Sequence, residues 1–138
     1  MRNHSSETEA LLRRLQALVS AGEASLPSPA DIVHYDFNPA NILVVGPTVS
    51  GVVDWEGVRA GDRAFDLATL LFYVWEAPPT RTLILGRLDQ LRPRPVIGAY
   101  VAHVILRQVE WSLRFHTPEI SGRYLRRAHA VLKELEAD

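Results

Sequence analysis

Four polar residues that could do chemistry, His34, Asp36, Asn41 and Asp54, stand at the ends of short apolar runs. The first three fall within DIVHYDFNPANILVV, residues 31–45, and Asp54 ends the next run, SGVVDW. A hairpin between the two runs would bring Asp54 back beside Asn41, because the turn lies near the midpoint of the two positions. An amide and a carboxylate that meet in this way form an oxygen-only site, which suits a hard cation such as Mg²⁺. Asp36, slightly apart, would then be available to hydrogen-bond an incoming hydroxyl group.

The residues around these groups indicate a small β unit between helices. Residues 5–20 carry leucines at helical spacing, and residues 21–30 form a connector with glycine and prolines. The runs IVHY, NILVVG and SGVVDW are typical of strands, and GPTVS carries hairpin-turn residues. Helical patterns follow to the end, the first of them capped by Asp62. Residues 94–116 are apolar nearly all round and are expected to form the central buried helix, with Trp75 and Trp111 packed in the core.

These patterns predict one domain of the α+β class, mainly α, because 138 residues suffice for a single core. We expect a leading helix and linker over residues 1–30. A loop and metal-binding hairpin would follow over residues 31–61, and a helical subdomain over residues 62–138.

The composition of the chain indicates which classes of binding partner and which compartment to expect. The chain is 47% hydrophobic and 22% charged, and its net charge of −1 gives no electrostatic case for nucleic acid or an anionic membrane. No apolar run reaches the length of a membrane span, and MRNHSSETEA lacks the apolar core of a signal peptide. The absence of cysteine excludes disulfides and thiolate metal sites. We therefore expect a cytoplasmic protein with no nucleic-acid and no membrane partner.

The spacing of the polar residues resembles that of kinases. His34-x-Asp36-x-x-x-x-Asn41 is similar to the kinase catalytic loop, and Asp54-Trp55 to the metal-binding segment. GDRAFDLA follows at residues 61–68. The combination most closely resembles the aminoglycoside phosphotransferase and choline kinase group of small-molecule kinases, in which Asp-Trp replaces the Asp-Phe-Gly of protein kinases. The resemblance is close over residues 31–70 and implies the C-terminal lobe of a protein kinase-like fold.

The resemblance also implies roles for individual residues. Asp36 would be the catalytic carboxylate that orients the acceptor hydroxyl and takes its proton. Asn41 and Asp54 would hold Mg²⁺ against the phosphates of ATP, with GTP as an alternative nucleotide. His34 would brace the loop, and Asp66 would do likewise from the first turn of the next helix.

Two acidic residues, Glu56 and Glu110, are predicted to bind a cationic acceptor, as acidic residues of the helical part do in aminoglycoside kinases. The acceptor implied is a hydroxyl group of a small molecule, aminoglycoside-like or an amino alcohol. The sequence departs from the family in two places. The family commonly has glycine where Tyr35 stands, and His-Pro-Gly where this chain has Asn-Pro-Ala at residues 38–40.

A complete kinase of this type also needs a nucleotide-binding N-lobe with a Gly-rich loop and a strand lysine. The eight glycines contain no G-x-G-x-x-G, and the only lysine is Lys133, near the C-terminus. We therefore expect a C-lobe without its N-lobe, whether a natural short protein or a fragment, with negligible activity alone. Self-association or an N-lobe partner would cover the apolar surface that this arrangement exposes.

Two functions remain in view from the sequence. The first is the C-lobe of an ATP- and Mg²⁺-dependent phosphotransferase, which the intact Asp36, Asn41 and Asp54 favour. The second is a non-catalytic remnant of the kinase fold that binds a ligand or a protein, which the missing N-lobe favours. Ordinary turn chemistry is the simplest alternative explanation for the three polar residues, but it does not account for their joint spacing.

Overall fold

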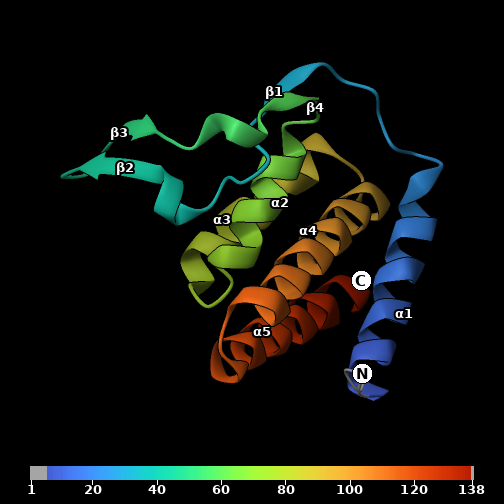
Figure 1. Ribbon diagram of the computed structural model, residues 1–138. Coiled ribbons are helices and arrows are strands. Elements are labelled where there is room, and N and C mark those ends of the chain that lie inside the picture. The colour runs from blue at the N-terminus through green and yellow to red at the C-terminus, as the bar shows by residue number, and fades with distance from the viewer. Residues whose placement is uncertain (1–5, 138) are drawn as a thin grey trace. The chain divides into compact units, whose positions relative to one another are not determined.

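The computed structural model describes residues 6–137 and has, within them, five α-helices and four short strands (Figure 1). The predicted α+β, mainly α class is confirmed. Packing divides these residues into two compact units. One is continuous, residues 27–92, and the other combines residues 6–26 with residues 93–137. No helix within residues 6–137 is long and apolar enough to cross a membrane.

The discontinuous unit consists of three helices, α1 (Ser6–Glu23), α4 (Arg94–Phe115) and α5 (Pro118–Glu136). Helix α4 packs against both others and contributes buried residues along its length, so the predicted central buried helix is confirmed. It approaches α1 closely at Gly22, where an added Cβ would lie 2.3 Å from the carbonyl oxygen of Pro95. Helices α1 and α5 are joined by Arg14, which donates hydrogen bonds of 2.9 and 2.8 Å to the two carboxylate oxygens of Glu136.

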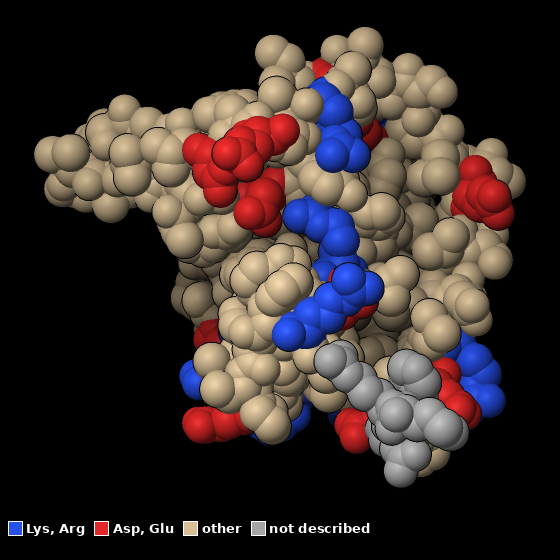
Figure 2. All heavy atoms as spheres, viewed as in Figure 1, with Lys and Arg blue, Asp and Glu red and all other residues tan. Residues whose placement is uncertain are grey.

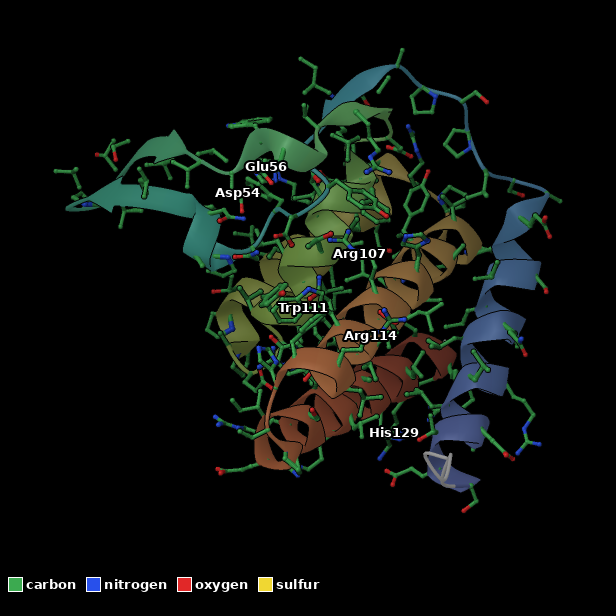
Figure 3. The ribbon with its side chains drawn as sticks, in the orientation of Figure 1. Asp54, Glu56, Arg107, Trp111, Arg114 and His129 are labelled. Atoms are coloured by element: carbon green, nitrogen blue, oxygen red, sulfur yellow. The ribbon has the colours of Figure 1, made fainter. Side chains whose placement is uncertain are left out.

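One expectation for the core is wrong. Trp75 is buried, with 6% of its surface exposed, but Trp111 is 51% exposed. The Trp111 ring lies against Phe115 and His116 near the end of α4, with both centroid distances 4.9 Å. Trp111 lies on the exposed side of α4, between Arg107 and Arg114 (Figure 3). Its apolar neighbours in the sequence therefore did not indicate its burial correctly.

The continuous unit holds all the strands and two helices. Its strands are β1 (Asp31–Val33), β2 (Ile42–Val45), β3 (Thr48–Val52) and β4 (Arg59–Gly61), and its α-helices are α2 (Ala64–Tyr73) and α3 (Pro78–Leu91). The strands form two antiparallel pairs, β2 with β3 and β1 with β4. The 3₁₀ turn η1 (Pro39–Asn41) immediately precedes β2. A second one, η2 (Trp55–Gly57), follows β3 after Val53 and Asp54.

The predicted hairpin is confirmed as β2–β3. Its strands run from the Ile42–Val52 pair to the Val45–Thr48 pair, and the two-residue turn starts at Gly46, whose φ of 58° favours glycine. Apolar side chains of both strands are exposed, Val45 by 71% and Val49 by 60%. Residues 42–53 contain no charged side chain, so the hairpin offers solvent an uncharged apolar surface.

Strand β4 was not predicted. It pairs with β1 over three residues, from Asp31 opposite Gly61 to Val33 opposite Arg59. Its sequence, RAG, has no apolar alternation, so only the long-range pairing makes it a strand. Helix α2 follows at once, and Asp62 accepts a hydrogen bond of 3.0 Å from the backbone N–H of Ala64, as expected of a residue that starts a helix.

Candidate active site

The loop between β1 and β2 is fixed by the buried ring of His34, which is 1% exposed. The backbone N–H of Asp36 lies 3.3 Å from Nδ1 of His34, and a backbone N–H can only donate. Nδ1 is therefore the acceptor, and the proton is on Nε2, which donates to the carbonyl oxygen of Val53 at 2.7 Å. The ring of Trp55 covers His34 at a centroid distance of 4.6 Å. His34 thus ties the loop to the end of the hairpin.

Asp66 holds the same loop from the first turn of α2. Its two carboxylate oxygens accept hydrogen bonds from the backbone N–H groups of His34, at 2.8 Å, and Tyr35, at 2.9 Å. Tyr35 has a φ of 76°, in the left-handed region that favours glycine. This is the position at which the resembling family commonly has glycine.

The side chain of Tyr35 is held on this unusual backbone by two further contacts. Its ring stacks on that of Phe65, with a centroid distance of 5.3 Å and an interplanar angle of 9°. The guanidinium carbon of Arg59 lies 3.6 Å from the centre of the Tyr35 ring. A left-handed non-glycine residue costs about 1–3 kcal/mol, and these contacts together with Asp66 offset that cost.

Asp36 and Asn41 are joined across η1. The carbonyl oxygen of Asp36 accepts a hydrogen bond of 2.9 Å from Nδ2 of Asn41, and one of the same length from the backbone N–H of Asn38. Asn38 in turn caps η1, because its Oδ1 accepts from the N–H of Ala40 at 2.9 Å. Since Nδ2 of Asn41 is engaged, Oδ1 is the atom left for a ligand, and no other residue within 6–137 hydrogen-bonds to it.

Asp54 follows the hairpin directly. The backbone N–H of Val53 donates to the carbonyl oxygen of Asn41 at 2.9 Å, which extends the pairing of the two strands by one hydrogen bond. Asp54 is the next residue after Val53. Asp54 is exposed and has a φ of 63°, a conformation that aspartate adopts more readily than most residues. Its carboxylate makes no hydrogen bond or ion pair with any residue within 6–137.

Oδ1 of Asn41 and the carboxylate of Asp54 are the groups that could hold a magnesium ion bound together with phosphates. Within residues 6–137, no three histidine, aspartate or glutamate side chains are placed to hold a metal by themselves. Mg²⁺ does not require such a cage, since it commonly takes one or two protein oxygens and completes its six ligands with phosphate oxygens and water. The donor set, one amide and one carboxylate oxygen, therefore suits the ion but would bind it weakly without a nucleotide.

Of the two predicted acceptor-binding residues, only Glu56 belongs to the unit that carries the loop. It lies on η2, exposed, close to Asp54 in sequence and in Figure 3. Figure 2 shows acidic side chains gathered in the region where Figure 3 labels these two residues. Glu110 lies on α4, in the other unit, where it forms an ion pair with Arg114.

Two residues that support the loop, Arg59 and Asn38, were not predicted. The Asn-Pro pair at residues 38–39 is a turn signal from which the cap could have been foreseen. Nothing in the sequence around Arg59 indicates that it stacks on Tyr35, because that contact depends on the pairing of β4 with β1.

Comparisons with known proteins agree with this geometry. A model of the phosphotransferase enzyme family matches residues 1–100. The chain resembles crystal structures of aminoglycoside phosphotransferase APH(4)-Ia. With the ternary complex of a thermostable mutant with AMP-PNP and hygromycin B, the TM-score is 0.76 at 20% identity. With the apo form of a thermostable mutant, the TM-score is 0.76 at 19% identity. Curated proteins give no match.

The chain therefore belongs to the phosphotransferase enzyme family, and the predicted kinase-like fold is confirmed. Both structural matches cover 94% of this chain and 45% of the APH(4)-Ia chain, so the chain spans less than half the length of these relatives. The part matched is their C-terminal part.

Proposed function

We propose that the chain is the catalytic-loop portion of a phosphotransferase that moves the γ-phosphoryl group of ATP to a hydroxyl group of a small molecule. The observation that carries the proposal is the network joining Asp36, Asn41 and the end of β3. Asn41 bonds to Asp36 through its side chain and to Val53 through its backbone. These hydrogen bonds hold the backbone at Asp36, at Asn41 and at Val53, the residue before Asp54. The side chains of Asp36, Asn41 and Asp54 are of types that suit phosphoryl transfer.

In this function each residue has one task. The acceptor oxygen bonds to the γ-phosphorus, the bond from that phosphorus to the bridging oxygen of ADP breaks, and the hydroxyl proton passes to the carboxylate of Asp36. Asn41 and Asp54 would hold Mg²⁺, which supplies charge neutralisation on the phosphates. His34 and Asp66 do not touch the reactants but keep the loop backbone in place through the hydrogen bonds described above.

The acceptor we propose is a hydroxylated cation. Glu56 is exposed beside Asp54 and makes no hydrogen bond or ion pair with any residue within 6–137. A carboxylate in that state can accept from an ammonium group of an aminoglycoside-like or amino-alcohol acceptor. The structural relative APH(4)-Ia was crystallised with hygromycin B, which is consistent with this class. We propose the cytoplasm as the compartment, because ATP is abundant there.

The metal and nucleotide part of the proposal can be tested without turnover. Mn²⁺ replaces Mg²⁺ at oxygen sites and broadens the NMR signals of nearby nuclei. We expect Mn²⁺ with ADP to broaden the amide signals of Asn41 and Asp54 first, and Asp54→Asn to remove the effect. Glu119→Gln, which changes an exposed carboxylate on α5, is the matched control and should leave the broadening unchanged.

The outcomes separate the two functions considered. Broadening spread evenly over exposed carboxylates, with no difference between the two variants, would contradict a phosphate–metal site. Site-specific broadening without ATP turnover is the expected result for the 138-residue chain alone. Turnover by that chain, abolished by Asp36→Asn, would overturn the expectation of negligible activity. Binding of an aminoglycoside with no response to nucleotide and metal would favour the ligand-binding remnant.

We further propose that another polypeptide surface, a second copy or an N-lobe, covers the β2–β3 hairpin. The support is its exposed, uncharged apolar surface, in which Val45 is 71%, Val44 63% and Val49 60% exposed. Sedimentation velocity over a range of concentrations tests self-association. Val45→Lys should shift the chain toward monomer if copies pair through the hairpin. A monomer at all concentrations would leave the N-lobe as the proposed cover and exclude the second copy.

A further inference from the structure

Arg59 on β4 is an exposed arginine whose guanidinium group contacts an aromatic ring and a carbonyl oxygen. The guanidinium carbon lies 3.6 Å from the centre of the Tyr35 ring, and Nε donates a hydrogen bond of 3.1 Å to the carbonyl oxygen of Gly57. Arg59 forms no ion pair with any residue within 6–137. Its side chain therefore serves the loop between β1 and β2 and the turn η2, to which these two contacts belong.

The two contacts connect the segments that carry Asp36 and Asp54. Tyr35 immediately precedes Asp36, and Gly57 is the last residue of η2, which starts directly after Asp54. The segments lie against each other at this point, because a Cβ built at Gly57 would lie 3.6 Å from Cβ of Tyr35. The arginine thus joins the loop to the turn where the two already meet.

This connection complements one that His34 makes on the other side of Asp54. His34 donates to the carbonyl oxygen of Val53, the residue before Asp54, at 2.7 Å. Arg59 bonds to the end of η2, on the side after Asp54. The segment that carries Asp54 is therefore joined to the loop on both sides, and a segment held at two points has less conformational freedom than one held at a single point.

Tyr35 is the residue that needs this support. Its φ of 76° lies in the left-handed region, which is unfavourable for a residue with a bulky side chain. The ring is held by stacking on Phe65 and by the guanidinium group of Arg59. If the contact with Arg59 is lost, Tyr35 can relax toward a negative φ, and Asp36, the next residue, moves with it.

We propose that Arg59 is a positioning residue, which holds the Tyr35 ring and η2 together and thereby keeps Asp36 at a fixed position relative to Asp54. The part that this position plays in phosphoryl transfer rests on the function proposed above. Arg59 acts through Tyr35 and is needed because that residue is not glycine. Glycine adopts a positive φ without steric cost, so Tyr35→Gly should make the arginine dispensable.

Amide hydrogen exchange in a double-mutant cycle tests the proposal. Arg59→Ala should speed exchange at the amides of Tyr35 and Asp36 roughly two- to fivefold, the factor that corresponds to a cation–π contact of about 0.5–1 kcal/mol. In the Tyr35→Gly background, Arg59→Ala should leave exchange at residues 35 and 36 unchanged. Any effect of the alanine on β4 itself is present in both backgrounds, so the cycle isolates the contact between the two side chains.

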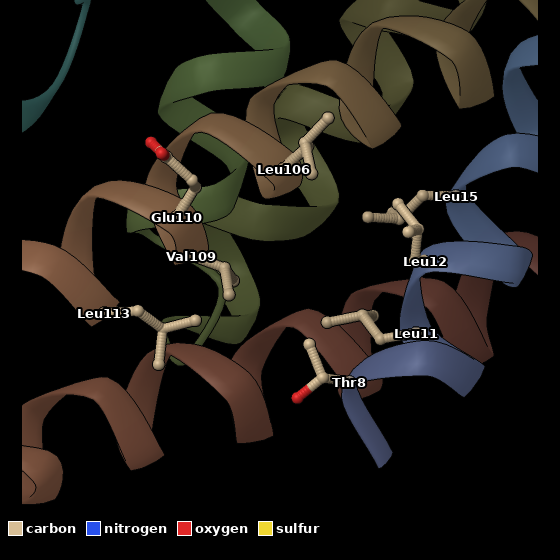
Figure 4. A pocket seen from close by; sticks show the side chains of 8 residues that line it. All are labelled: Thr8, Leu11, Leu12, Leu15, Leu106, Val109, Glu110 and Leu113. Carbon is tan, nitrogen blue, oxygen red and sulfur yellow. The ribbon is translucent and has the colours of Figure 1, made fainter. Parts of the chain in front are cut away.

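Arg63→Ala is the matched control, because Arg63 is also exposed and lies in the same unit but pairs with Asp31. It should leave the loop amides unchanged. The internal reference is a pair of amides in the discontinuous unit, those of Leu11 and Val109 beside the hollow between α1 and α4 (Figure 4). A purely structural role of Arg59 would speed exchange throughout residues 27–92 and would not be rescued by Tyr35→Gly.

Two results of the cycle would overturn the proposal. One is unchanged exchange at Tyr35 and Asp36 in Arg59→Ala, and the other is an equal increase in both backgrounds. Circular dichroism shows whether Tyr35→Gly folds. If it does not fold, the unchanged chain decides, because the Tyr35 ring should shift the side-chain proton signals of Arg59 upfield, and ordinary arginine shifts would refute the contact.

Mn²⁺ with ADP, added to the same samples, keeps this inference separate from the proposed function. Broadening confined to Asn41 and Asp54 with an unchanged exchange cycle would retain the function and refute the role of Arg59. A coupled cycle without confined broadening would support the role of Arg59 in the loop and contradict the function. Where both hold, Arg59→Ala should lower the broadening at Asp36 relative to Asn41, and an unchanged ratio would refute the positioning of Asp36.

Discussion

Replacing Asp66 with asparagine should destabilise the chain, because Asp66 holds the backbone of the loop between β1 and β2 from the first turn of α2. The Asp66 carboxylate accepts from the N–H groups of His34 and Tyr35, at 2.8 and 2.9 Å. Asparagine keeps one acceptor oxygen and turns an NH₂ group toward the other N–H. A hydrogen bond to a charged group contributes about 1.5–3 kcal/mol, and an unpaired donor adds its own cost, so we expect a loss of about 2–3 kcal/mol in the free energy of unfolding.

The assay is urea unfolding followed by tryptophan fluorescence, with thermal melts in parallel. At roughly 4 °C per kcal/mol for a chain of this size, the melting temperature should fall by about 8–12 °C. Amide hydrogen exchange should also become faster at His34 and Tyr35, because these two N–H groups lose an acceptor. Asp54→Asn makes the same chemical change in the same unit at a carboxylate with no partner within residues 6–137. It should alter stability by less than about 0.5 kcal/mol.

The reasoning would be refuted by either of two results. If Asp66→Asn unfolds within about 0.5 kcal/mol of the unchanged chain, the two hydrogen bonds do not hold the loop. If Asp54→Asn costs as much as Asp66→Asn, then loss of negative charge in this region, rather than loss of the two bonds, explains the effect.

Three further predictions concern other parts of the chain. Gly22→Ala should destabilise by about 2 kcal/mol or more, because its Cβ would lie 2.3 Å from a backbone oxygen of α4. Gly86→Ala, with nothing within 4 Å of the added Cβ, should instead stabilise α3 by about 0.5–1 kcal/mol. Urea unfolding of both variants tests this, and a change of the same sign in their free energies of unfolding would contradict the reasoning. Arg92→Ala should lower the free energy of unfolding by about 2–4 kcal/mol in the same assay, because the carboxylate of Asp62, which is 4% exposed, loses the guanidinium group 2.6 Å away. A loss below about 1 kcal/mol would show that water replaces the guanidinium group. The neighbouring guanidinium on α1 lowers the pKa of Glu136 below its ordinary 4.5, so the carboxylate's contribution exists at neutral pH and is lost as the pH falls through the lowered value. Glu136→Gln should therefore lower the melting temperature slightly at pH 7 and by progressively less as the pH falls below 4.5, whereas a difference that does not change with pH would argue against the pair.

The parts of the fold that could be predicted from sequence are those that depend on residues close together in the chain. The hairpin followed from two apolar runs around Gly46, and the long buried helix α4 from its apolar residues on nearly every side. The subdomain boundaries at residues 30/31 and 61/62 stay a prediction. Strand β4 could not be foreseen, because Arg-Ala-Gly becomes a strand only by pairing with residues about 28 positions earlier.

The candidate site divides in the same way. The spacing of Asp36, Asn41 and Asp54 was visible in the sequence, and their roles stay a proposal. What the sequence did not reveal is how the backbone between them is held. Tyr35 adopts a glycine-like conformation that its residue type does not indicate, although the resembling family commonly has glycine at this position. Arg59 stacks on Tyr35 from strand β4, which was not predicted. Contacts of this kind depend on tertiary structure, so residue type and spacing alone cannot predict them.

The discontinuous unit has a consequence for how the chain folds during synthesis. Helix α1 packs on α4, yet Gly22 and its contact Pro95 are 73 residues apart in sequence. At a translation rate of about 5–20 residues per second, α1 waits roughly 4–15 s for its partner to be made. Residues 27–92 form a continuous unit and can fold within that interval, while the leucine face of α1 stays uncovered. The nascent chain is therefore most exposed to aggregation, and most in need of a chaperone, before α4 has been synthesised.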